Sequence, residues 1–270
     1  MSQYEEWFSA VSTGKVFDCN PRELTIFRSY LDANLSPAEA AEQLTAPAPP
    51  QWNSSFTGRL WTMILFLAKD YEEAHDDLVA LVQEFFTAEP GDIDWAEEKK
   101  TYLPESWRAT YDYLASDHSE IGNLTDPTSA QWVNYNAFTA RLLSVSVLKT
   151  QYWALRLVVD ALEKKVDLTK PTARQDGDIT AAAQYFIHAA KDMLENELWN
   201  KAGSRYTTTW GDESQLWHGE KGLSLERWTF WKTRFGEMRV AEGLSENAQE
   251  AARRAEVSMD KAERQKKKKH

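Results

Sequence analysis

Apolar residues recur every three or four positions along most of this chain, which is the spacing of an α-helix with one face in a core. Between Phe56 and Tyr71 they cover most of the helix circumference, so this segment predicts a helix in the middle of a bundle. No stretch shows the alternation and β-branched enrichment of a strand. The sequence therefore predicts an all-α protein, a single-domain irregular bundle of about ten helices. Besides 56–71, the main expected helices cover 3–11, 21–31, 36–44, 76–86, 105–114, 130–147, 151–166, 179–199 and 223–238.

Capping residues mark where some of these helices begin. The pair Asn20–Pro21 fits an N-cap followed by proline at the first helical position. Ser36 and Glu39 have the spacing of a capping box, in which each residue satisfies a free backbone amide of the other. Ser224 also fits an N-cap, but Arg227 stands where the box needs Glu or Gln.

The connecting segments predict how the chain is divided. Ala46–Pro50 predicts an extended strap that is too short to separate independent domains. Asp117–Thr128 predicts a surface loop, and Pro171–Asp178 predicts a turn. We therefore expect one helical domain over residues 1–243, followed at 244–270 by a polar, fraying helix and a basic, disordered tail.

The segment 223–238 carries aromatic residues on two faces with cations between them. One reading is a central core helix whose Arg and Lys stems cover aromatic rings. The other is a helix that lines a pocket for an anionic, aromatic or amide-bearing ligand. The spacing leaves both open. One face holds Leu225, Trp228, Trp231 or Lys232, and Phe235, and the second holds Arg227, Phe230, Arg234 and Met238.

Charge is distributed unevenly along the 270 residues. The net charge is −11, but the last ten residues hold six cations and one carboxylate, a net charge of +5, so the first 260 sum to −16. An acidic body is a poor general nucleic-acid binder. The tail, with Lys266, Lys267, Lys268 and Lys269, is either a solvated end or a contact for RNA, an acidic partner or an import receptor.

Several classes of site find no support in the sequence. The single cysteine, Cys19, excludes an internal disulfide and a cysteine-based metal cage. No phosphate-binding glycine loop is present, and His188 with Asp192 is the one helical pair spaced for a shared metal. We expect no metal and no cofactor. The longest apolar run, 63–68, is too short to cross a membrane, and the N-terminus lacks a signal-peptide pattern, so we expect a cytoplasmic protein, or a nuclear one through its Lys-rich tail.

Polar residues inside otherwise apolar helices are the main candidates for chemistry. Asn136 lies within the apolar stripe of its helix, and Arg156 and Glu163 lie beside theirs. Buried charges need partners, so we expect Arg141 or Arg156 to pair with Glu163, Glu195 or Glu197. Such charges either form a structural network or face a cavity, where they would suit proton transfer or ligand recognition.

Several motifs together resemble a fungal family that is catalogued only as a domain of unknown function. The resemblance covers about residues 20–240 and implies a single-domain, intracellular, helical protein, with no catalytic residues to carry over. The motifs are Ser36-Pro-Ala-Glu-Ala-Ala-Glu-Gln-Leu-Thr45, Leu60-Trp61, Asn136-Ala-Phe-Thr-Ala-Arg-Leu142, Trp153-Ala-Leu-Arg156 through Ala161-Leu-Glu163, and Arg227-Trp-Thr-Phe-Trp-Lys232.

A second resemblance, which rests on chain size and setting, is to fungal cyclodipeptide synthases that join arginine to a second residue from aminoacyl-tRNAs. It implies a small-molecule enzyme of secondary metabolism without ATP or metal. Its catalytic residues would be Glu195 and Glu197, and its tRNA contacts the tail lysines 266–269. The substrate-binding residues would be Asn136, Arg141, Arg156, Glu163, Trp228, Trp231, Lys232 and Arg234.

The alternative function is a non-catalytic helical adaptor or binding protein. In it the same aromatic residues are core, and the basic tail contacts an acidic partner. One structural observation separates the two hypotheses. A deep, polar-lined pocket beside the 227–234 helix favours the enzyme, whereas a filled core with its charges paired to one another favours the binding protein.

Overall fold

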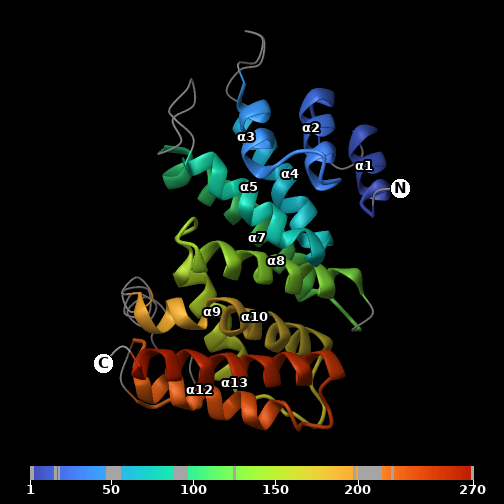
Figure 1. Ribbon diagram of the computed structural model, residues 1–270. Coiled ribbons are helices and arrows are strands. Elements are labelled where there is room, and N and C mark those ends of the chain that lie inside the picture. Colours follow the sequence, from blue (N-terminus) through green and yellow to red (C-terminus); the bar gives the residue numbers. More distant parts are fainter. Residues whose placement is uncertain are drawn as a thin grey trace. The chain divides into compact units, whose positions relative to one another are not determined.

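The all-α prediction is confirmed by the computed structural model, which describes residues 3–14, 17, 19–46, 56–87, 97–123, 126–196, 199, 215–219 and 222–268. This part of the chain contains eleven α-helices and no strand (Figure 1). The contacts divide the chain into two units, Met1–Asp112 and Tyr113–His270. Within the described residues, no helix combines the length and the apolar character needed to cross a membrane.

The first unit is built around the apolar helix α4, whose residues Leu60, Trp61, Ile64 and Leu65 are buried. The two predicted N-terminal caps are confirmed. Asn20 accepts a hydrogen bond from the amide of Arg22, and Ser36 and Glu39 bond reciprocally as a capping box. The helices are α1 (Glu5–Ser12), α2 (Pro21–Leu31), α3 (Pro37–Thr45), α4 (Phe56–Asp70), the 3₁₀ turn η1 (Glu72–Ala74), α5 (His75–Thr87), the π-helix η2 (Glu98–Tyr102) and α7 (Leu103–Ser119), which continues into the second unit.

The second unit is arranged around α10 (Ala173–Glu195), which lies between α8 (Pro127–Ser144) and α13 (Glu246–Lys267) in Figure 1. Small residues let these helices approach closely, because buried alanines stand on both α10 and α13. The remaining helices are α9 (Gln151–Leu162) and α12 (Leu225–Met238). The aromatic-rich helix α12 packs mainly against α13, so α10 rather than α12 is the centre of this unit.

Two predicted connections are wrong in part because helices extend into them. The segment predicted as a turn at 171–178 is mostly the first turns of α10, which begins at Ala173. Its cap is a capping box formed by Thr172 and Gln175, a signal that the sequence contained. The predicted loop at 117–128 begins later than expected, since α7 runs to Ser119. Residues 47–50 of the predicted strap lie outside the described residues.

The C-terminal segment forms a helix almost to its end. Helix α13 runs to Lys267, with Lys268 as its C-cap, where the sequence predicts fraying and a disordered tail. Burial of Ala248, Ala251 and Met259 along one face explains the difference, because a helix packed on a neighbour does not depend on its own propensity. Contacts group this helix with the second unit, and a domain boundary at residue 243 stays a prediction.

Candidate functional site

Two buried charged residues of the second unit, Glu163 and Arg227, bind each other at the end of α9. Glu163 is the residue that caps α9, and its side chain is 0% exposed. Arg227, in the first turn of α12, donates from Nε to Oε1 at 2.7 Å and from Nη2 to Oε2 at 2.8 Å. Trp231 Nε1 donates to the same Oε1 at 2.8 Å. Both carboxylate oxygens are therefore bound by groups of the protein itself.

Further hydrogen bonds complete this network. The third guanidinium nitrogen of Arg227 donates to the carbonyl of Gly222 at 3.0 Å. The main-chain carbonyl of Glu163 accepts from the amides of Gln215 and Leu216 at 2.9 and 3.0 Å. The guanidinium also lies over the ring of Trp231, 5.5 Å from its centroid. A buried ion pair is tolerated when each charge is matched in this way, so the geometry is that of a structural network.

The expected pairing of Glu163 with Arg141 or Arg156 is wrong. Arg156 lies on the same helix as Glu163 but seven residues earlier, about 10 Å along the axis, which is too far for a direct contact between them. Its guanidinium lies 5.7 Å from the ring centroid of Trp153 instead. Arg227 reaches Glu163 because the first turn of α12 packs against the end of α9.

Two other predicted binding residues hold helices together. Asn136 is 0% exposed, donates from Nδ2 to the carbonyl of Trp132 at 2.8 Å, and accepts from the hydroxyl of Tyr185 at 2.7 Å. It thus ties α8 to α10. Arg234 donates from Nε to the carbonyl of Leu162 at 3.1 Å and pairs with Glu237, so it covers the end of α9.

Trp228 and Lys232 meet at one carboxylate of α13. Trp228 Nε1 donates to Glu263 Oε1 at 2.9 Å, and Lys232 Nζ donates to the same oxygen at 2.7 Å and to Asp260 at 3.1 Å. Burial opposes the ammonium charge, but the hydrogen bonds to these carboxylates prevail and raise the pKa of Lys232. Both side chains therefore join α12 to α13.

The predicted catalytic residue Glu195 is the last residue of α10. It is exposed and lines two hollows of about 240 and 570 Å³. Lys266 lines the smaller one, and its ammonium donates to the carbonyl of Leu194 at 3.1 Å, which suits the negative end of a helix. Glu197 and Lys269 lie outside the described residues, and Lys267 and Lys268 are exposed.

The larger hollow is lined by His188 and Asp192, the pair spaced for a metal. His188 Nε2 lies 2.9 Å from Nη1 of Arg141, so it accepts a hydrogen bond from a cation. Asp192 accepts from Nδ2 of Asn196 at 3.0 Å and from Nε1 of Trp199 at 2.6 Å. Within the described ranges, no three His, Cys, Asp or Glu side chains gather as metal ligands do.

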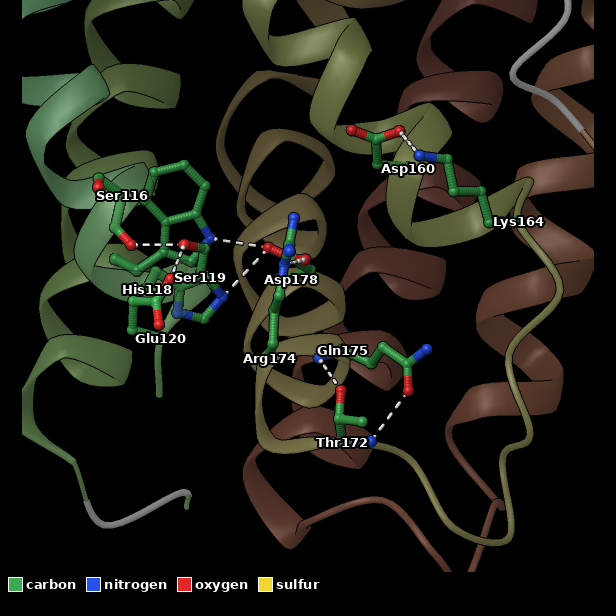
Figure 2. A network of polar contacts seen from close by, with 11 residues as sticks. Ser116, His118, Ser119, Glu120, Asp160, Lys164, Thr172, Arg174, Gln175 and Asp178 are labelled. Carbon is green, nitrogen blue, oxygen red and sulfur yellow. Dashed lines mark hydrogen bonds and ion pairs between the residues drawn. The ribbon is translucent and has the colours of Figure 1, made fainter. Parts of the chain in front are cut away.

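A second polar contact, which sequence reasoning missed, joins α7, α8 and α10. His118 is 2% exposed, stacks on the ring of Trp132, and places Nε2 3.2 Å from Asp178 Oδ1 (Figure 2). Trp132 Nε1 donates to that oxygen at 3.1 Å, and Arg174 lies 3.6 Å from the other. Gly177 allows this approach, because a Cβ there would lie 2.5 Å from His118 Cε1.

This contact was missed because His118 and Asp178 fell in the segments predicted as a loop and a turn. The capping box that starts α10 was the signal that places Asp178 on a helix. No sequence signal shows that His118 faces it.

Comparisons with known proteins give a family but no described activity. Neither the curated proteins nor the solved structures contain a match to this chain. A family model covers more than half of the chain, including most of α4 and the Glu163–Arg227 network, and the expected membership of a family without an assigned function is confirmed. The chain belongs to the family described as "Protein of unknown function (DUF3632)", whose model matches residues 61–235.

Proposed function

We propose that this protein is a non-catalytic helical binding protein that acts through its outer surface. The observation that carries the proposal is the closed network at Glu163. A catalytic or ligand-binding charge must reach the ligand, whereas both oxygens of this carboxylate are bound by Arg227 and Trp231. The other charged and polar residues predicted for α12 and α8 are likewise bonded to neighbouring helices, as in Lys232 and Asn136.

Metabolite profiling by mass spectrometry tests this proposal. A host expressing the wild-type chain is compared with hosts expressing Glu195→Ala, the matched exposed variant Glu242→Ala, and an empty vector. We expect no metabolite that depends on the wild-type chain. A new metabolite that disappears with Glu195→Ala and persists with Glu242→Ala overturns the proposal.

A second candidate is aminoacyl-tRNA-dependent synthesis of an arginine-containing cyclic dipeptide in fungal secondary metabolism. The observation in its favour is that Glu195 lines both hollows, one of them beside Lys266. A carboxylate there suits an arginyl guanidinium, and Lys267 and Lys268 are exposed for tRNA phosphates. The same profiling identifies it, because the new metabolite would then be an arginine-containing cyclic dipeptide.

A further inference from the structure

Helix α13 separates its charges by sign over its last four turns. Its carboxylates face α12, where Glu256 pairs with Arg239 at 3.2 Å, and Asp260 and Glu263 both pair with Lys232. Lys232 balances only one of the two carboxylate charges of Asp260 and Glu263, and the side chain of Asp260 is 50% exposed. Between residues 253 and 268 every charged residue in the exposed class is basic, although the carboxylate of Asp260 also reaches solvent.

Four of those basic residues form one exposed row. Arg254, Lys261, Arg264 and Lys268 are all exposed, and their spacing of seven, three and four residues keeps them on one face of the helix. The face opposite carries the alanines that pack on α10. At 1.5 Å per residue, this basic row is about 21 Å long. The four residues of the row are all cations, but the exposed Glu250, which pairs with Arg253, lies one turn before Arg254 on the same face, and the chain as a whole has a net charge of −11.

The composition of the basic row indicates what kind of partner fits it. A membrane-binding helix inserts an apolar face, but the apolar face of α13 is buried inside the protein. A protein partner would need an apolar centre, and Val257 is the sole large apolar side chain that the described part of α13 exposes. Single-stranded nucleic acid is held by stacking on aromatic rings, and residues 246–268 contain none.

Duplex phosphates need only cations at suitable spacing, because they bind through charge and counterion release. The major groove of B-form DNA admits an α-helix, whereas that of A-form RNA is too narrow. We propose that the basic row of α13 docks on the phosphate backbone of double-stranded DNA. This inference rests on the proposed binding function. The acidic remainder of the protein is screened beyond about 8 Å at physiological salt.

Fluorescence anisotropy with a labelled DNA duplex of mixed sequence, titrated with the full-length protein over a range of salt, tests the inference. The test variant combines Lys261→Ala, Arg264→Ala and Lys268→Ala. The control variant combines Lys149→Ala, Lys165→Ala and Lys170→Ala, which removes the same charge from exposed positions of the same unit. We expect wild type and control to bind alike, and the test variant to bind at least tenfold more weakly, with a log–log salt slope shallower by about three.

Three outcomes overturn the inference: no binding of DNA at low salt, equal losses in the two triple variants, or tighter binding of duplex RNA, single-stranded DNA or polyglutamate than of duplex DNA. Tighter binding of polyglutamate would point to an acidic protein partner instead. None of these outcomes bears on whether the chain makes a metabolite, so the proposed function is judged separately by the profiling experiment.

Discussion

Glu163 and Arg227 are joined by two hydrogen bonds of 2.7 and 2.8 Å although 64 residues separate them in the chain. The carboxylate follows the last residue of α9, and the guanidinium stands in the first turn of α12. Both side chains are buried, so neither charge is screened by water. The pair therefore fixes where α12 begins against the end of α9.

Removing one member of this pair should destabilise the protein strongly. Glu163→Gln keeps the size and the oxygen that Trp231 binds, but it leaves the guanidinium of Arg227 buried without an opposite charge. We expect the free energy of unfolding to fall by about 3–5 kcal/mol, measured by urea denaturation followed by far-UV circular dichroism.

The matched control for that measurement is Glu250→Gln, because Glu250 pairs with Arg253 while both side chains are about half exposed. An exposed pair contributes little, so the change should stay within about 0.5 kcal/mol. A loss at Glu163→Gln no larger than at Glu250→Gln would contradict the structural role of the buried pair.

Adding one methyl group to two helical glycines should have opposite effects. In Gly177→Ala the new Cβ would lie 2.5 Å from His118, which cannot move aside because it is buried and stacked on Trp132. We expect the free energy of unfolding to fall by about 1–3 kcal/mol. In Gly236→Ala the nearest atom is 3.8 Å away, and the better helix propensity of alanine should stabilise by about 0.5–1 kcal/mol. Thermal unfolding measures both, and equal shifts would contradict the close packing of His118.

Local features of the fold were predictable because their causes are local. Helix periodicity predicted α4 and α8. The caps at Asn20, Ser36 and Ser224 were predicted from residue type and spacing, because a cap depends on hydrogen bonds between residues close in the chain. The error at 171–178, which was predicted as a turn, also has a local cause. The capping box of Thr172 and Gln175 starts a helix there despite the preceding proline.

The candidate sites were less predictable because they depend on contacts between distant residues. The sequence shows that Glu163 lies beside an apolar stripe and so needs a cation, but several arginines satisfy that requirement equally well. Choosing Arg227 requires the packing of α12 on the end of α9. Helix periodicity likewise cannot show that Glu195 falls on an exposed end of α10.

The capping box of α3 should make stability depend on pH at the acidic end. Hydrogen bonds from the hydroxyl and then the amide of Ser36 lower the pKa of Glu39 below its ordinary value of 4.5. A carboxyl group with a lowered pKa stabilises the folded state above its unfolded pKa, and this contribution is lost as the pH falls through the folded value.

Glu39→Gln should therefore reduce stability at pH 7 and have a smaller effect at pH 3, because Gln keeps the box without the charge. Urea denaturation at the two pH values measures this, with Glu42→Gln on the same helix as control. A difference between wild type and Glu39→Gln that grows on acidification would contradict the assignment.

The hydroxyl of Tyr185 should matter through the buried amide that it binds. Tyr185→Phe removes the hydroxyl that donates to Asn136 Oδ1 at 2.7 Å. Asn136 is 0% exposed, so its oxygen loses this hydrogen bond while it stays buried. We expect a loss of about 1–3 kcal/mol in urea denaturation. The control Tyr102→Phe changes an exposed ring and should be nearly neutral; equal effects at the two positions would contradict the tie between α8 and α10.

A double-mutant cycle on Glu163 and Arg227 tests the central claim most directly. Arg227→Met keeps an unbranched apolar stem and removes the charged guanidinium, and Glu163→Gln with Arg227→Met removes both charges while Trp231 keeps its acceptor. We predict that the double variant loses less stability than the sum of the single variants, with a coupling of about 2–3 kcal/mol. Additive losses would contradict the claim, because they would mean that the carboxylate and the guanidinium do not depend on each other and that the charge of Glu163 serves another purpose.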